Sequence, residues 1–92
     1  MKPITAFYLH ECPYCKKAKA AIEELIAENP QYGQVPITWY EETEQPEAIE
    51  GHDFYYVPSM FIEKEKCYEA QTGQTYDEIK EHVKNVFDKA LR

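Results

Sequence analysis

The sequence predicts an α/β domain in which a mixed sheet of four strands carries helices on both faces. Three observations lead to this class. The chain begins with a strand, a helix and a second strand, continues with two short strands around a charged turn, and ends in an amphipathic helix. A strand–helix–strand unit pairs its strands in parallel through a right-handed crossover, whereas strands joined by a tight turn pair antiparallel. Joined in one sheet, the two units give a mixed architecture.

The first half of the chain supplies the parallel unit. Residues 4–9 are mostly apolar and rich in β-branched and aromatic side chains, which is typical of a buried strand. Pro13 suits the first turn of a helix, because the N–H that it lacks has no partner there. Apolar residues then recur at helical spacing as far as Ile26. We expect Pro30 to end this helix and residues 35–40 to form the second strand.

The middle of the chain supplies a short helix and a hairpin. Residues 46–49 predict one short helix, which Gly51 ends. Residues 59–62 are a compact apolar run and predict the third strand. A charged turn at residues 63–66 follows, and residues 67–70 predict the fourth strand.

The last helix carries the clearest local signals. Glu78 follows Thr75 by three residues, which is the spacing of a capping box in which each side chain binds the other residue's backbone N–H. Apolar residues then share one helical face: Ile79, Val83, Val86, Phe87, Ala90 and Leu91.

Length and composition exclude several classes of protein. Ninety-two residues suit one domain, residues 1–92, and 43% apolar with 29% charged side chains is an ordinary globular composition. A net charge of −7 makes nucleic acid and anionic lipid poor partners. No apolar run reaches the roughly 18 residues of a membrane span. The start of the chain lacks the apolar stretch of a signal peptide, so we expect a cytoplasmic protein, and we expect it to be a monomer.

The first functional signal is a pair of cysteines, Cys12 and Cys15, at the junction of the first strand and the first helix. Residues three apart share a helix face, so their sulfurs can meet and bond. Unpaired N–H groups and the positive dipole end of the helix stabilise a thiolate on Cys12. Lys16 and Lys17 add to this effect if their side chains reach the sulfur, and His10 is a further candidate for tuning the thiol.

This placement predicts dithiol redox chemistry. The Cys12 thiolate attacks a substrate disulfide, Cys15 displaces the reduced product, and the resulting Cys12–Cys15 disulfide is opened by a second reductant. Half of a zinc site is the alternative interpretation, with the remaining ligands drawn from Cys67, His10, His52 and His82. These residues show no second paired spacing, so we predict no metal site and expect Cys67 to be a packing residue.

Cys12-Pro13-Tyr14-Cys15 after a strand resembles the active-site motif of dithiol glutaredoxins, and Val57-Pro58 resembles the Val–cis-Pro of the thioredoxin-fold superfamily. The resemblance extends over nearly the whole chain. It implies a sheet in the order 2-1-3-4, a cis Pro58 beside the sulfurs and a Val57 backbone free to pair with substrate. Tyr14 is a candidate for lining the substrate groove.

The resemblance also implies an activity. A glutaredoxin-like protein is a thiol–disulfide oxidoreductase that reduces protein disulfides or glutathione mixed disulfides, with glutathione as the reductant and no bound cofactor. Glutaredoxins typically carry Gly-Gly after the fourth strand and then an Asp, whereas this chain has Glu69 and Ala70, with Asp77 several residues late. Glu69 would repel a glutathione carboxylate if it faced the site.

Other functions stay open at this point. One is a thioredoxin-like electron carrier that a flavin-dependent reductase serves in place of glutathione. Another is an iron–sulfur or metal carrier in which Cys12 bridges a cluster between two chains, although such carriers usually have a single active-site cysteine. A third is a binding module that keeps the fold without the thiol chemistry.

Overall fold

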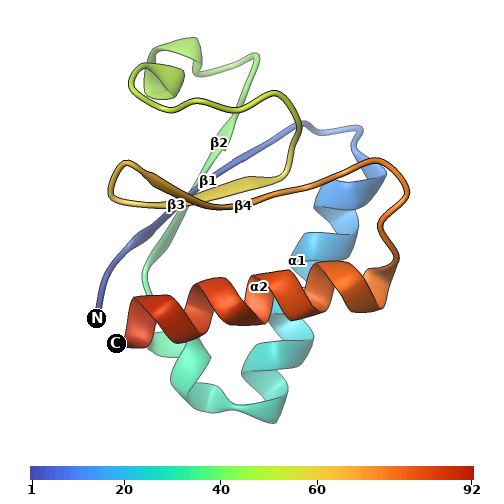
Figure 1. The fold of residues 1–92 in the computed structure, drawn as a ribbon, viewed down its shortest axis with the longest axis vertical. Helices are drawn as coiled ribbons and strands as arrows, with labels where there is room; N and C mark the ends of the chain where they lie inside the picture. The colour runs from blue at the N-terminus through green and yellow to red at the C-terminus, as the bar shows by residue number, and fades with distance from the viewer.

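The computed structural model describes residues 1–92 and contains one four-stranded sheet with two long helices (Figure 1). The elements follow in the order β1 (Ile4–Tyr8), α1 (Pro13–Glu28), η1 (Pro30–Gln34), β2 (Ile37–Glu41), η2 (Pro46–Ile49), β3 (Ser59–Ile62), β4 (Glu65–Glu69) and α2 (Tyr76–Leu91), where η denotes a 3-10 helix.

The sheet has the strand order β2-β1-β3-β4, which confirms the predicted order 2-1-3-4. β1 pairs with β2 in parallel and with β3 antiparallel, and β3 pairs antiparallel with β4. The parallel pair is joined through α1, as the strand–helix–strand pattern predicts, and the last two strands form the predicted hairpin. The fold class predicted from the sequence is therefore confirmed.

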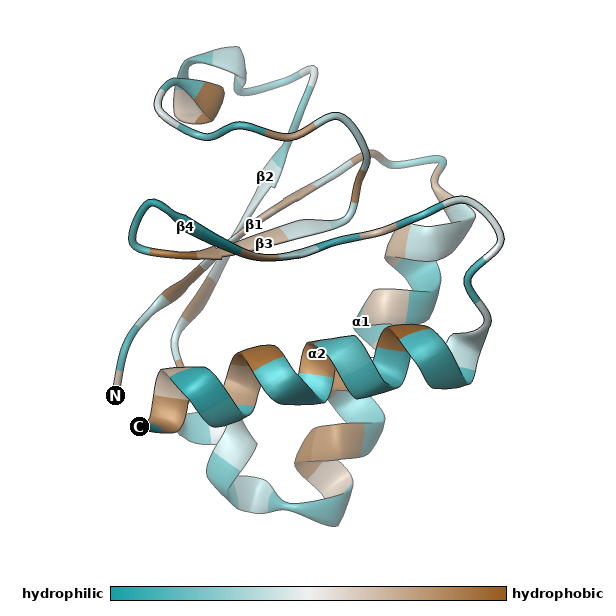
Figure 2. Ribbon diagram, in the orientation of Figure 1, coloured by the Kyte–Doolittle hydropathy of each residue, from teal (hydrophilic) through white to brown (hydrophobic).

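One face of the sheet packs against both long helices. α1 and α2 also contact each other, so they lie on the same side of the sheet (Figure 1). Hydrophobic positions recur along one side of α2 (Figure 2), as the spacing predicts. The main core lies between these layers and includes Ile4, Ala6, Ala18, Leu25, Met60, Ile62, Ile79, Val83 and Phe87.

The other face of the sheet is covered more thinly than the sequence predicts. The short helix at residues 46–49 is present, but it is a single 3-10 turn, so neither long helix covers this side. An aromatic cluster fills the space instead, in which Phe54 stacks on Phe7 at 4.8 Å between ring centroids and His52 lies edge-on to Phe61 at 4.7 Å. The segment between η2 and β3 thus takes the place of a covering helix.

Element boundaries differ from the prediction near prolines and turns. The second strand begins at Ile37, two residues later than expected, because Pro36 has no N–H to donate to the sheet. Pro30 ends α1 as predicted but also starts η1, which was not predicted. None of the helices combines the length and the apolar character that a membrane span requires.

Candidate active site

Cys12 lies at the N-cap of α1, where its sulfur replaces the oxygen of an ordinary capping side chain. Its backbone is extended, with φ −120° and ψ 112°, and Pro13 follows in the first turn. The Cys15 N–H donates a hydrogen bond to the Cys12 Sγ at 3.2 Å. Because this N–H would otherwise lack a partner in the first turn, it is a ready donor to a charged sulfur.

Cys15 lies one turn into α1 and is the more deeply buried of the two thiols. Cys15 is 2% exposed and Cys12 is 8% exposed. Burial, together with the hydrogen bond and charge of the neighbouring Cys12, raises the pKa of the Cys15 thiol to about 12. Cys15 is therefore a neutral thiol at neutral pH. Both cysteines are free, so the structure shows the dithiol form.

Val57, the residue before Pro58, lies against the first sulfur, although the two are 45 residues apart in sequence. The Val57–Pro58 peptide is cis, as the resemblance implies. The Cys12 thiol donates to the Val57 carbonyl, with 3.5 Å between Sγ and O. The Pro58 side chain is buried, and its carbonyl accepts a hydrogen bond from the Ala70 N–H at 3.0 Å. The Val57 N–H has no partner within the chain.

Tyr14 ties the start of α1 to the loop that precedes α2. Its hydroxyl accepts a hydrogen bond from the Gly73 N–H at 2.7 Å, and the Lys17 ammonium lies 5.6 Å from its ring centroid. Lys16 is exposed and makes no ion pair. The lysine whose charge reaches the buried thiol is Lys19, which lowers the pKa of Cys15 slightly against the larger effect of burial.

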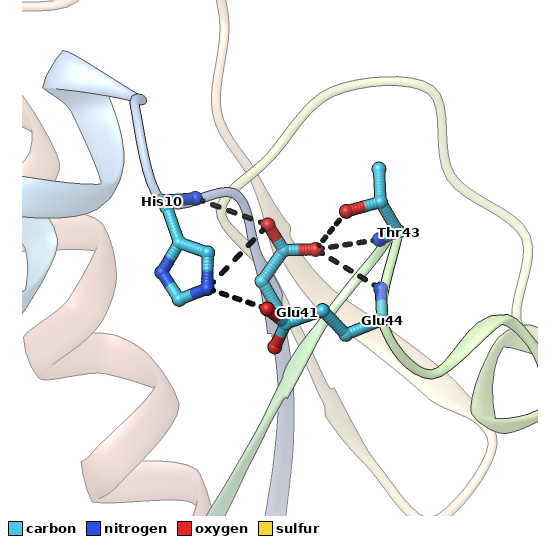
Figure 3. A network of polar contacts seen from close by, with 4 residues as sticks. All are labelled: His10, Glu41, Thr43 and Glu44. Carbon is cyan, nitrogen blue, oxygen red and sulfur yellow. Dashed lines mark hydrogen bonds and ion pairs between the residues drawn. The ribbon is translucent and has the colours of Figure 1, made fainter.

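His10 forms no hydrogen bond with either sulfur and instead faces acidic side chains, which Figure 3 shows. Its Nε2 lies 3.0 Å from a Glu44 carboxylate oxygen, and its backbone N–H donates to Glu41 at 3.3 Å. Glu41 is buried at the end of β2 and also accepts two hydrogen bonds of 2.6 Å, from the Thr43 hydroxyl and the Thr43 N–H. The Thr43 hydroxyl is the main cause that holds the pKa of Glu41 below its ordinary range.

This network links the loop before Cys12 to the end of the neighbouring strand. Sequence reasoning missed Glu41, because its contact with His10 forms only when β1 and β2 pair. The one local signal is Thr43, two residues on, whose hydroxyl and N–H can both reach back to a side-chain acceptor.

Comparison with known proteins identifies the family of this chain. Residues 4–84 match the family model described as a thioredoxin domain. The chain belongs to the thioredoxin domain family. Among solved structures, thioredoxin 1 from the thermophilic eubacterium Thermosipho africanus TCF52B is similar over 98% of this chain and 99% of its own, with a TM-score of 0.56 and 14% sequence identity. At that identity the likeness shows the fold alone. No curated protein matches the sequence.

Membership of the thioredoxin domain family confirms the predicted superfamily and indicates thiol redox chemistry in general. The glutaredoxin subtype stays a prediction. The two residues in the place of Gly-Gly are in different environments. The Ala70 side chain is buried, with 2% exposed. The Glu69 carboxylate accepts hydrogen bonds from the backbone of the segment that precedes Val57.

The residues that the sequence offered as further zinc ligands lie apart in the thioredoxin fold. His52 belongs to the aromatic cluster, His82 stacks on Tyr68, and the Cys67 thiol donates to the carbonyl of Glu65 on its own strand. No group of three or more His, Cys, Asp or Glu side chains lies close enough together to hold a metal ion.

Proposed function

We propose that this protein is a thiol–disulfide oxidoreductase that reduces protein disulfides or glutathione mixed disulfides through Cys12 and Cys15. One observation carries the proposal. Two free thiols lie at the N-terminus of α1, joined by the N–H···S hydrogen bond of Cys15 to Cys12, and the first sulfur also contacts the Val57 carbonyl. Helix N-termini of this kind favour thiolates, which are the nucleophiles of disulfide exchange.

The exchange takes two steps. The Cys12 thiolate attacks one sulfur of the substrate disulfide, and the other sulfur leaves as a thiolate that takes a proton. Cys15 then gives up its proton and attacks the Cys12 sulfur, which releases the second substrate thiol. The substrate gains two electrons and two protons, and the protein is left with a Cys12–Cys15 disulfide. The buried Cys15 thiol supplies the resolving sulfur and one of the two protons.

The Val57 backbone is the proposed docking site for the substrate. Its free N–H and its carbonyl lie beside the nucleophile, and an extended polypeptide can pair with such groups as an added strand. Pro58 anchors this segment through its buried ring and its bond to Ala70, and Tyr14, half-buried at the start of α1, is the candidate for a wall of the substrate groove.

The source of electrons distinguishes two forms of the proposal. Glutathione is the reductant that the Cys-Pro-Tyr-Cys motif favours. A flavin-dependent reductase is the second candidate, and two observations favour it: the family match is to a thioredoxin domain, and a charged Glu69 stands where glutaredoxins carry glycine.

A coupled turnover assay tests both forms. The oxidation of NADPH is followed with one of two reducing systems: glutathione with glutathione reductase, or a thioredoxin reductase. The substrates are the mixed disulfide of glutathione with β-mercaptoethanol, and disulfide-bonded insulin. We expect Cys12→Ser to abolish turnover and Cys15→Ser to keep only turnover of the mixed disulfide. Cys67→Ser is the matched control and should match the wild type. Wild-type turnover in Cys12→Ser would contradict the mechanism.

A further inference from the structure

Glu69, the last residue of β4, holds the backbone immediately before Val57. Its Oε2 accepts hydrogen bonds from two consecutive amides, the Tyr55 N–H at 2.6 Å and the Tyr56 N–H at 2.8 Å. Its Oε1 accepts a hydrogen bond from the Lys66 ammonium at 2.8 Å. Both carboxylate oxygens thus accept hydrogen bonds, and Oε2 binds two consecutive amides of the segment that precedes Val57.

The carboxylate of Glu69 is ionised in this setting. Its side chain is 16% exposed, and burial opposes the charged form. The hydrogen bonds from Lys66, Tyr56 and Tyr55 outweigh that effect and lower the pKa of Glu69. Asp53 lies near the same lysine and brings a second negative charge to this side of the site.

These contacts leave a defined set of groups for a ligand. The amides of Tyr55 and Tyr56 are occupied, the Tyr56 carbonyl accepts a hydrogen bond from the Ser59 hydroxyl, and the Pro58 carbonyl is bound to Ala70. The Val57 N–H stays free. The side chains of Tyr55 and Tyr56 point to solvent, 87% and 56% exposed.

We propose that Glu69 is a positioning residue that fixes the Tyr55–Val57 backbone for an extended polypeptide disulfide and disfavours glutathione. This inference rests on the proposed function. Glutathione carries a net negative charge at neutral pH, so the Glu69 and Asp53 carboxylates repel it. An internal cysteine of a polypeptide lacks the terminal carboxylates that flank the cysteine of glutathione, and the polypeptide can use the exposed tyrosine rings as contact surface.

Three variants of the full chain separate the effects of Glu69. Glu69→Ala removes both the acceptor and the charge, and Glu69→Gln keeps an acceptor oxygen without the charge. Lys66→Met, the matched control, removes the ion pair but leaves the bonds to Tyr55 and Tyr56. Reduction of disulfide-bonded insulin and of the β-mercaptoethanol–glutathione mixed disulfide gives kcat and KM for each variant. Hydrogen exchange at the Tyr55 and Tyr56 amides reports on the contacts without any turnover.

We expect Glu69→Ala to raise KM for insulin about tenfold, the size of one lost charge-assisted hydrogen bond, and to leave kcat within about twofold. Its Tyr55 and Tyr56 amides should exchange faster. Glu69→Gln should have a KM for insulin close to the wild-type value, and its KM for the glutathione mixed disulfide should be lower than that of the wild type. Lys66→Met should stay within about twofold of the wild type for insulin and keep both amides protected.

Two results would overturn the inference alone. In the first, the wild type is active and the folded Glu69→Ala variant has the same KM for insulin as the wild type. Its Cys12 also reacts with iodoacetamide at the wild-type rate. The other is a Lys66→Met variant that reproduces the losses of Glu69→Ala. A wild type that reduces neither substrate would instead overturn the proposed function, and this inference with it.

Discussion

At the scale of single residues, Cys12 and Cys15 differ because the helix places them differently. Cys12 caps α1 and faces the Val57 carbonyl, whereas Cys15 points into the interior one turn later. Burial is the main cause that raises the pKa of Cys15 to about 12, so Cys15 keeps its proton at neutral pH. The proposed division into an attacking and a resolving thiol thus follows from position along a single helical turn.

This difference predicts selective alkylation. At neutral pH, iodoacetamide should modify Cys12 well before Cys15, and Cys15 should become reactive only as pH rises toward about 12. The folded state binds the Cys15 proton more tightly than the unfolded state. The stability that this proton contributes is therefore complete below pH 9.0 and is lost as pH rises through the folded value. Peptide mapping by mass spectrometry measures the order of modification, with Cys12→Ser to isolate Cys15. Equal rates at neutral pH would contradict the assignment.

At the scale of elements, α2 is defined by its own sequence. The Thr75 hydroxyl accepts the Glu78 N–H at 3.2 Å, and the Glu78 carboxylate accepts the Thr75 N–H at 2.9 Å, so both halves of the predicted capping box form. Such local patterns are complete within four residues of sequence. The bounds of this helix could therefore be predicted closely.

Loss of that cap should destabilise the protein measurably. Thr75→Ala leaves the Glu78 N–H without its acceptor and should lower the free energy of unfolding by about 1 kcal/mol. Thr72→Ala is the matched control, since Thr72 is exposed in the preceding turn and forms no hydrogen bond through its side chain; it should change stability by less than about 0.5 kcal/mol. Urea denaturation measures both. Equal stability of the two variants would show that the cap contributes nothing.

At the scale of the whole molecule, the two faces of the sheet are built differently. The helices bury one face, and the 42–58 segment with η2 runs over the other (Figure 1). Phe54 of this segment packs there against Phe7 of β1 and Phe61 of β3. The same segment ends in Pro58 and in Val57, whose carbonyl contacts the Cys12 sulfur. The covering layer and the proposed substrate groove are therefore one stretch of chain, fixed at its end by Glu69.

Comparison of sequence and structure shows which features are accessible to sequence reasoning. The Cys12–Cys15 helix start could be predicted from local patterns, and the strand order and the cis Pro58 could be predicted from the resemblance to a known family. The roles of Glu41 and Glu69 could not, because Glu41 binds His10 from 31 residues away and Glu69 reaches back 13 and 14 residues to Tyr56 and Tyr55. The sequence predicts a helix at residues 46–49, and the structure has a single 3-10 turn there. The expectation of helices on both faces of the sheet therefore holds for the long helices on one face only.

Trapping of the mixed disulfide tests the central claim most directly. Cys15→Ser removes the resolving thiol, so its Cys12 should stay joined to a disulfide-bonded substrate such as insulin. Intact-mass spectrometry without reductant should show a covalent adduct with Cys15→Ser, which peptide mapping assigns to Cys12, and none with Cys12→Ser. Absence of an adduct with Cys15→Ser, or an adduct assigned to Cys67, would contradict the proposal that Cys12 is the nucleophile.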